Sequence, residues 1–542
     1  MSKIPEGTLG KELEDYLLHD YTPDELPPDS LLQHLDSDRT IEKILAKDNA
    51  TAATFYDLTR LALVPNRLLS LRGTQIIPTL MDLFRSYSEQ HQPYEYEYGF
   101  HCVEAILFVL LIGVLDGETE LLQMYMAEVM ALPGPVSTAA FHDVIEQCLG
   151  PILESGEELG EPDERSWGFD PWTKTLVPAF GGFTADDLHC FVTAIWGGRK
   201  HMFWAHTITG VSALWRCGIA VLCLFLGRTS HSHELGPKLY NIALRLEFNS
   251  SEDEFNLLDS VIESTFGIPG LSPDGQYSLN SVVDLEDAKL MLRKYHPWVL
   301  LMEQRLWETV NLCVTSASNI VVQLNDLELH LEFLKSHLRV MWSGILRYDE
   351  DPGDIERATL LILFATSTLK HIEFVVTRNL AKNVPPCIEM VFTEGDFVNL
   401  MGRTLLWLPR FASTYYPHEE IGDIMTQLEL LYETFIELAR ATEPVVPSLL
   451  IVTPRPFDIW SDWDKTLVFF QHTQQVYRAE NNQNLLTYLD MMTKGWEEFG
   501  RMIPYGFWHL YCANPDCGRI DPSMRCARCC TMRYCNKRCQ QR

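Results

Sequence analysis

Six cysteines near the carboxyl end of the chain have the spacing of metal ligands. They form three close pairs, C-x4-C, C-x2-C and C-x3-C, made of Cys512 and Cys517, Cys526 and Cys529, and Cys535 and Cys539. Zinc is held by four ligands in a tetrahedron, and short spacings of this kind let one turn of chain supply two thiolates. Seven of the 14 cysteines lie in this segment. That concentration favours bound zinc over redox-active or incidental thiols.

Basic residues are interleaved with these cysteines: Arg519, Arg525, Arg528, Arg533, Lys537 and Arg538. A zinc ion held by four thiolates has a net charge of about −2, which neighbouring cations offset. The same cations stabilise the thiolate form of each cysteine. In the last pair, the i, i+4 spacing predicts that Cys535 and Cys539 lie on one face of a short helix. The segment therefore predicts a small zinc-binding module over residues 505–542.

This segment resembles the MYND-type zinc finger. The resemblance covers Cys512–Arg542 and includes Arg533-Tyr534-Cys535 and Cys539-Gln540, which look like the RYC and CQ elements of that family. The family's finger is a cross-braced module that holds two zinc ions and binds proteins, commonly proline-containing peptides. The resemblance implies that the first and third pairs share one structural zinc, whose ligands are Cys512, Cys517, Cys535 and Cys539.

The same resemblance assigns Cys526 and Cys529 to a second zinc. In the family, a His and a Cys several residues past the CQ element complete that site, and the sequence stops at Arg542. We therefore expect a finger that is incomplete at its C-terminus and holds one zinc. A second zinc is expected only if Cys530, His509 or a partner chain supplies a ligand. A competing assignment groups the first pair with the second in one sequential zinc-ribbon site.

The rest of the chain has the periodicity of helices. From Leu324 to Met341, apolar residues recur at alternating steps of three and four, which places them on one helix face. Three more apolar residues widen this stripe: Leu329, Phe333 and Val340. A core helix packed on two neighbours is therefore favoured over a coiled coil. The segment Pro417–Arg440 repeats the pattern with an acidic outer face.

The predicted fold class is all-α, a large irregular helical array with a small C-terminal zinc-binding module. No fixed repeat period stands out, and an armadillo-like superhelix is one form that such an array can take. We predict an acidic α-helical domain over residues 1–500, followed by the finger at 505–542. Irregular segments lie near 150–184, 266–284 and 444–456, and the first of them marks a predicted sub-boundary.

Charge is unevenly distributed along the chain. The net charge is −31, and residues 501–542 contain eight Lys and Arg against two Asp and Glu, so residues 1–500 carry −37. A field of that sign repels phosphate backbones and anionic lipid, which argues against a nucleic-acid or membrane partner. Most of the tail's positive charge is expected to balance the cysteine thiolates.

Two apolar runs, Ala105–Leu115 and Gly218–Gly227, are shorter than the roughly 20 residues that a membrane-spanning helix needs. They predict buried core helices instead. The first residues of the chain lack the apolar segment of a secretory signal. We therefore expect an intracellular protein, cytoplasmic or nuclear and not secreted, whose cysteines are reduced.

These features predict a non-catalytic zinc-binding scaffold or adaptor whose finger recognises a protein partner. The layout of a long helical region ending in a finger is similar to that of many fungal MYND-domain proteins of unassigned activity. The alternative is a helical metal-dependent hydrolase of the HD type, in which the finger serves recruitment. Its candidate residues are His142-Asp143, with His101 and His189 as partners. Side chains of the types that bind metal ions, histidine and glutamate, are also adjacent in the sequence at His231–Glu234. We interpret this segment as the exposed start of a helix.

Overall fold

The computed structural model describes about three fifths of the chain in two compact units. The described residues are 6–21, 37–47, 50–63, 65–117, 119–132, 138–154, 169–170, 173–247, 249, 288–293, 321, 326–348, 364–373, 375, 384–405, 430–434, 436–437, 456–480, 483–500, 524–525 and 533–538. Of the described part, 82% is helical, which confirms the all-α prediction. The units are Met1–Val282 and Val283–Arg542. Their division falls within the irregular segment 266–284, and the predicted sub-boundary near 150–184 lies inside the first unit.

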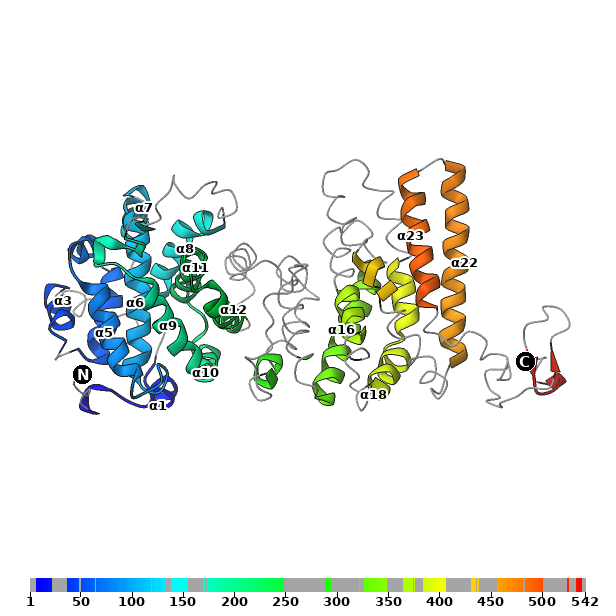
Figure 1. Cartoon of the computed structure of the whole chain (residues 1–542), viewed down its shortest axis with the longest axis horizontal. Helices are drawn as coiled ribbons and strands as arrows, with labels where there is room; N and C mark the ends of the chain where they lie inside the picture. Colours follow the sequence, from blue (N-terminus) through cyan, green and yellow to red (C-terminus); the bar gives the residue numbers. More distant parts are fainter. Residues whose placement is uncertain are drawn as a thin grey trace. The chain divides into compact units, whose positions relative to one another are not determined.

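The first unit is built almost entirely of helices (Figure 1). Its α-helices are α1 (Leu13–His19), α3 (Ser37–Leu45), α4 (Ala52–Thr59), α5 (Ile76–Ser88), α6 (Glu97–Gly117), α7 (Thr119–Ala131), α8 (Thr138–Glu154), α9 (Ala185–Gly197), α10 (Arg199–Thr209), α11 (Ala213–Gly227) and α12 (Ser232–Glu247). Short 3-10 turns lie at Glu6–Thr8, Arg60–Leu63, Pro65–Leu71 and Pro178–Phe180. A two-residue hairpin pairs β1 (Phe169–Asp170) with β2 (Thr175–Leu176).

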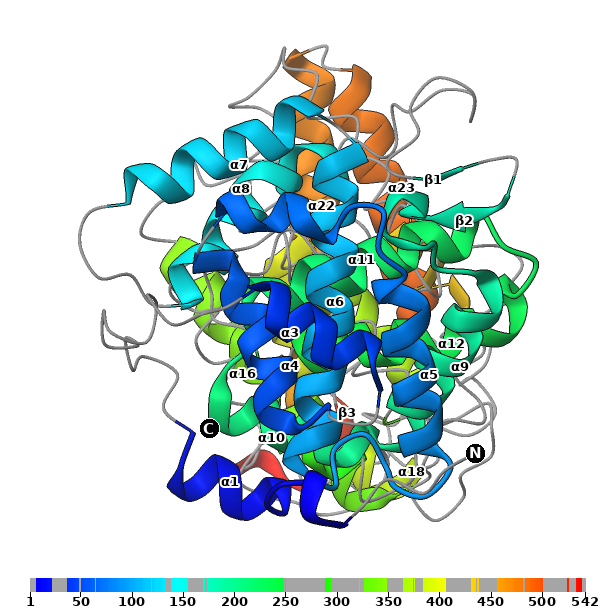
Figure 2. The same ribbon diagram turned by 90° about the vertical axis from the view of Figure 1, so that its left-hand side faces the viewer.

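Two apolar helices, α6 and α11, form the core of this unit. They contain the two apolar runs of the sequence, and their residues are buried almost without exception, which confirms that both are core helices. Helices α4, α5 and α11 pack against α6, and Figure 2 shows α4 and α5 beside it. The two core helices approach closely at Gly218, where a Cβ atom would lie 2.9 Å from Leu107. A larger residue at position 218 would therefore require the Leu107 side chain to shift.

Helix α6 is long and apolar enough to cross a membrane by length and composition. Within its most apolar 18-residue window, however, 94% of the residues are buried inside the unit. Burial on all sides explains its composition, because a helix that is surrounded by other helices has no solvent face to keep polar.

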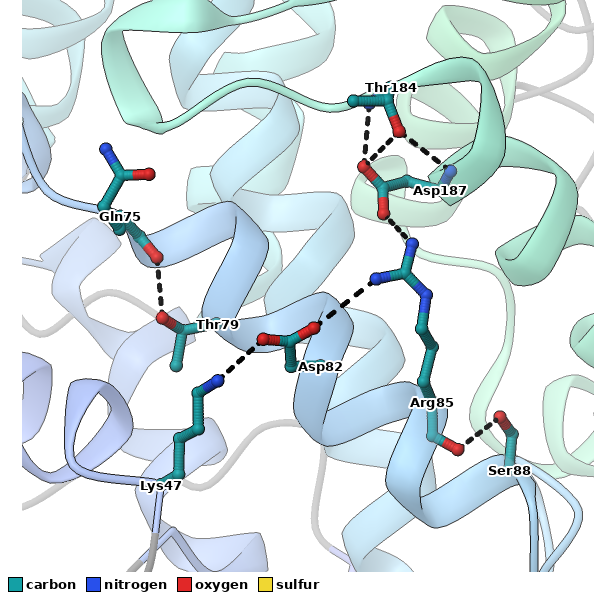
Figure 3. Close-up of polar contacts among 8 residues, drawn as sticks. All are labelled: Lys47, Gln75, Thr79, Asp82, Arg85, Ser88, Thr184 and Asp187. Atoms are coloured by element: carbon teal, nitrogen blue, oxygen red, sulfur yellow. Dashed lines mark hydrogen bonds and ion pairs between the residues drawn. The ribbon is translucent and has the colours of Figure 1, made fainter. Parts of the chain in front are cut away.

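A chain of polar contacts joins α5 to the start of α9 (Figure 3). Thr184 and Asp187 form a capping box at the N-terminus of α9, in which each side chain accepts the other's backbone N–H. The guanidinium of Arg85 on α5 pairs with the buried Asp187 carboxylate and also lies 3.5 Å from Asp82. Asp82 in turn accepts a hydrogen bond of 2.6 Å from Lys47. The network fixes where α9 begins relative to α5.

The second unit also consists mainly of helices. Its longer elements are α16 (Leu327–Tyr348), α18 (Val384–Glu389), the π-helical turn η7 (Met390–Glu394), α22 (Pro456–Glu480) and α23 (Gln483–Phe499). Helices α22 and α23 pack side by side, and the hydrogen bonds of two tryptophans join them. The indole N–H of Trp463 donates to the Trp496 carbonyl at 2.9 Å, and that of Trp496 donates to the Trp463 carbonyl at 3.0 Å. Each buried indole thereby has its one donor satisfied.

The helix predicted from Leu324 to Met341 is present from Leu327 as α16, and Leu324 lies outside the described residues. The buried stripe of α16 is centred on other positions than the predicted one. Leu334, Leu338 and Met341 are buried as predicted, whereas Leu327 and Leu331 are only half-buried. Two histidines that the apolar pattern left out, His330 and His337, are fully buried on the same helix. Of the predicted helix Pro417–Arg440, residues 430–434 and 436–437 are described and helical, and the others lie outside the described residues.

Candidate metal centre and histidine clusters

The described part of the cysteine tail is a small antiparallel hairpin followed by a helical turn. Strand β3 (Met524–Arg525) pairs with β4 (Arg533–Tyr534), with Met524 opposite Tyr534 and Arg525 opposite Arg533. Cys535 follows β4 directly and is half-buried, and residues 537–538 are helical. The predicted ligands Cys512, Cys517, Cys526, Cys529 and Cys539 lie outside the described residues. One of the six proposed zinc ligands is therefore placed by the structure.

The residues of the alternative hydrolase site are dispersed, and the first of them, His101, is committed to structural contacts. His101 lies on α6 and is 1% exposed. Its Nδ1 is 2.9 Å from Glu104 Oε2 and its Nε2 is 3.1 Å from the Tyr16 hydroxyl. Both ring nitrogens thus have hydrogen-bond partners, as expected for a histidine that joins α1 to α6.

His142 and Asp143 lie on α8, next to a buried arginine of α11. Arg216 donates through its guanidinium to the Glu146 carboxylate and to the Val211 carbonyl at 2.8 Å. Burial, with the charge of Arg216 as a further cause, lowers the pKa of His142 to about 4. His142 is thus held neutral, while Asp143, its neighbour in the sequence, is exposed.

His189 lies on α9 and faces the start of α12 instead of α6 or α8. Its Nε2 is 2.9 Å from Glu234 Oε1, and its ring centroid is 5.4 Å from that of His231. The hydrogen bond from His189 lowers the pKa of the exposed Glu234 carboxyl. Helix α12 begins at Ser232, which confirms the helix start predicted at His231–Glu234. The Lys238 ammonium lies 3.5 Å from the same Glu234 oxygen and opposes a metal cation there.

Within the described part of the chain, no three His, Cys, Asp or Glu side chains are grouped so that they could hold a metal ion. The four residues of the HD-type alternative are among those described, and they lie on three different helices, α6, α8 and α9. Because a di-metal or mono-metal hydrolase needs its ligands around one ion, this arrangement gives the HD-type site no support.

A cluster of three buried histidines occupies the core of the second unit. His330 and His337 of α16 and His371 of the helical residues 364–373 are all fully buried. His330 Nδ1 lies 2.9 Å from His371 Nε2, and the Phe333 ring lies tilted against the rings of both His337 and His371. Burial lowers the pKa of His330 to about 4, and burial and the two other histidines lower that of His371 well below its usual value. His330 and His371 are therefore neutral imidazoles.

Apolar patterning did not predict this cluster, because His counts as polar in it. The signal in the sequence is the spacing of His330, Phe333, His337 and Met341, which share one helix face at steps of three and four. Two ring nitrogens of the cluster, His330 Nε2 and His371 Nδ1, have no hydrogen-bond partner among the described residues. When two neutral imidazoles are joined by one N–H···N hydrogen bond, only the two nitrogens that face each other have a partner.

A second set of buried polar atoms lies in the first unit, around Trp215 of α11. The ring of Trp215 contacts those of His206 and Tyr94, with centroids 4.6 Å and 6.2 Å away. Each of the three side chains is at least 98% buried and carries a polar atom without a hydrogen-bond partner in the described structure. His206 Nδ1 donates to the Gly210 carbonyl at 3.2 Å, and burial lowers the pKa of His206 to about 4. Each buried polar atom without a hydrogen-bond partner lowers the free energy of unfolding.

Comparisons with known proteins leave the chain without a family assignment. No family model matches it, and neither the curated proteins nor the solved structures gave a match. The site therefore has to be interpreted from its own residues.

Proposed function

We propose that this chain is a zinc-binding protein–protein interaction protein, a scaffold or adaptor whose C-terminal MYND-like finger is the recognition module. The observation that carries the proposal is the β3–β4 hairpin within the cysteine tail. Cys526 follows β3 in the sequence, and Cys535 follows β4. Because antiparallel strands end at opposite ends of their ladder, the chain leaves β3 and β4 in opposite directions. This supports placing the two cysteines in different sites, which a cross-braced finger requires and which the sequential zinc-ribbon assignment shares.

The proposed first site comprises Cys512, Cys517, Cys535 and Cys539, and the second contains Cys526 and Cys529. Four thiolates complete a tetrahedron and leave no position for a substrate, so the zinc of the first site is structural. Such an ion cross-links a segment too short to form a hydrophobic core of its own. The partner class that fits the resemblance is a protein segment, such as a proline-containing peptide.

In this proposal the helical units form the scaffold to which the finger is attached. Consecutive helices pack as pairs in the described structure, among them α7 with α8, α11 with α12, and α22 with α23. This pairing supports an array of helix pairs, for which an armadillo-like superhelix is the proposed form. An intracellular location is proposed for the chain because its cysteine-rich finger needs reduced thiols.

The test is the zinc content of the full chain and of three single variants. We expect about one zinc per wild-type chain. In a cross-braced finger, Cys512→Ala and Cys535→Ala each remove this same ion. In a sequential zinc-ribbon site, only Cys512→Ala removes it and Cys535→Ala keeps it. Cys530→Ala is the matched control and retains zinc in both arrangements unless Cys530 is itself a ligand.

Circular dichroism of the same variants separates loss of the finger from loss of the fold. The described helices lie outside the tail, so Cys535→Ala should release zinc and leave the helical signal nearly unchanged. Wild-type protein without zinc would contradict the proposal. Equal zinc in the wild type and in both ligand variants would do the same.

A further inference from the structure

The positive charge of the tail is confined to its last 18 residues. Residues 501–524 contain two basic and two acidic residues and are neutral overall. Residues 525–542 contain six basic residues and no acidic one: Arg525, Arg528, Arg533, Lys537, Arg538 and Arg542. The whole net charge of +6 therefore belongs to the hairpin, its connection and the segment that follows it.

Zinc binding balances only about a third of this charge, which corrects the expectation that the thiolates balance most of it. A complete four-thiolate site contributes about −2, and two thiolates with a second ion contribute about 0. Of the six positive charges, about four therefore remain without a compensating charge in the segment. Within the described residues of the segment, Lys537 and Arg538 are both exposed on the helical turn after Cys535.

The register of the hairpin concentrates like charges further. Arg525 lies directly opposite Arg533 in the β3–β4 ladder, while Met524 and Tyr534 occupy the neighbouring pair. Like charges at directly opposed positions destabilise an antiparallel ladder. A nearby anionic group lowers a cost of this kind, because a guanidinium can donate hydrogen bonds to a carboxylate.

We propose that the hairpin and the turn after it form a docking surface for an acidic segment of a partner protein, with Lys537 and Arg538, the exposed basic residues of that turn, as the recognising residues. The inference rests on the proposed function, because it needs a folded finger. It adds the chemistry of the partner: carboxylate side chains are required for binding, in addition to any apolar or proline contact.

A protein segment is favoured over a nucleic acid by the charge of the remaining chain. Residues 1–500 carry −37, and this field opposes a long polyanion along its whole length. A short acidic segment interacts mainly within one Debye length, about 8 Å at physiological salt, where the local positive residues dominate. Nucleic-acid binding is therefore the competing outcome of the test.

The experiment uses the full-length, zinc-loaded chain and fluorescence anisotropy of two labelled probes. One probe is a proline-containing peptide with several glutamates, and the other is the same peptide with glutamines. We expect the glutamate probe to bind, to weaken as NaCl is raised, and to bind roughly tenfold more weakly to Lys537→Glu/Arg538→Glu. The matched control is Arg339→Glu/Lys494→Glu, which makes the same change in net charge at exposed residues of α16 and α23 and should bind as the wild type does.

Several outcomes would overturn the inference. They are equal binding of both probes, equal weakening by the control variant, and tighter binding of single-stranded DNA of the same charge than of the glutamate probe. Zinc content is measured on every sample. If the charge-reversed variant loses zinc, the neutral variant Lys537→Gln/Arg538→Gln takes its place and should show a smaller loss in the same direction. Absence of zinc from the wild type refutes the proposed function itself. Zinc-loaded protein that binds the glutamate and glutamine probes equally refutes only the proposal of an acidic partner.

Discussion

At the scale of single residues, buried polar atoms without hydrogen-bond partners lower the stability of the fold. Tyr87 and Tyr94 provide a matched pair, because both are buried tyrosines of the first unit. The Tyr87 hydroxyl donates to the Gln92 carbonyl at 3.0 Å. The Tyr94 hydroxyl has no hydrogen-bond partner among the described residues. The same chemical group is therefore satisfied at one position and unsatisfied at the other.

We predict that Tyr94→Phe raises the free energy of unfolding by about 1 kcal/mol and that Tyr87→Phe lowers it by about 1 kcal/mol. The first variant removes an unsatisfied buried hydroxyl, and the second leaves the Gln92 carbonyl without its donor. Urea denaturation of both variants and the wild type measures the difference. Equal destabilisation by the two substitutions would show that the Tyr94 hydroxyl has a partner in solution.

At the scale of secondary-structure elements, the position of α9 depends on Asp187. This buried carboxylate caps the helix through Thr184 and pairs with Arg85 of α5. Asp82 contacts the same arginine and also Lys47, but its side chain is 51% exposed. Two aspartates that share one arginine therefore differ chiefly in burial and in the capping role.

We predict that Asp187→Ala lowers the free energy of unfolding by about 2–3 kcal/mol, since it removes both a helix cap and the partner of Arg85. Asp82→Ala should cost less than about 1 kcal/mol, as is usual for exposed ion pairs. Chemical denaturation followed by circular dichroism compares the two. A loss of similar size at both positions would mean that the cap contributes little.

At the scale of the whole molecule, both units enclose neutral histidines. Burial lowers the pKa to about 4 for His142 and His206 in the first unit and for His330 in the second. In the unfolded chain these groups titrate near the ordinary histidine value of about 6.5. Between these values the unfolded state binds more protons than the folded state, so stability falls as pH falls from about 6.5 towards 4. Above about 6.5 these histidines add no pH dependence.

We predict that the free energy of unfolding drops by several kcal/mol between about pH 7 and pH 4.5, measured from denaturant midpoints. His206→Gln should flatten this dependence, because glutamine does not titrate. His472→Gln is the control: His472 is exposed on α22, and its replacement should leave the slope unchanged. A slope that is identical in the wild type and in His206→Gln would contradict the assignment of buried neutral histidines.

Several features of the fold were already determined by the sequence. The apolar runs at Ala105–Leu115 and Gly218–Gly227 predicted buried core helices, and they lie in α6 and α11. The steps of three and four from Leu324 to Met341 predicted α16. Helical periodicity is a local property of the chain, so such elements can be predicted without knowing their neighbours.

Other features were decided only by the tertiary structure. The sequence pattern could not show that His330 and His337 meet His371, or that His101, His142 and His189 face different helices, because these contacts join residues far apart in the chain. Burial of the histidines likewise depends on which faces of two helices meet. The zinc ligands remain a prediction of the sequence, since only Cys535 lies in the described part. Spacing along the chain determines which residues can reach one ion together, whereas packing in three dimensions determines which of them do.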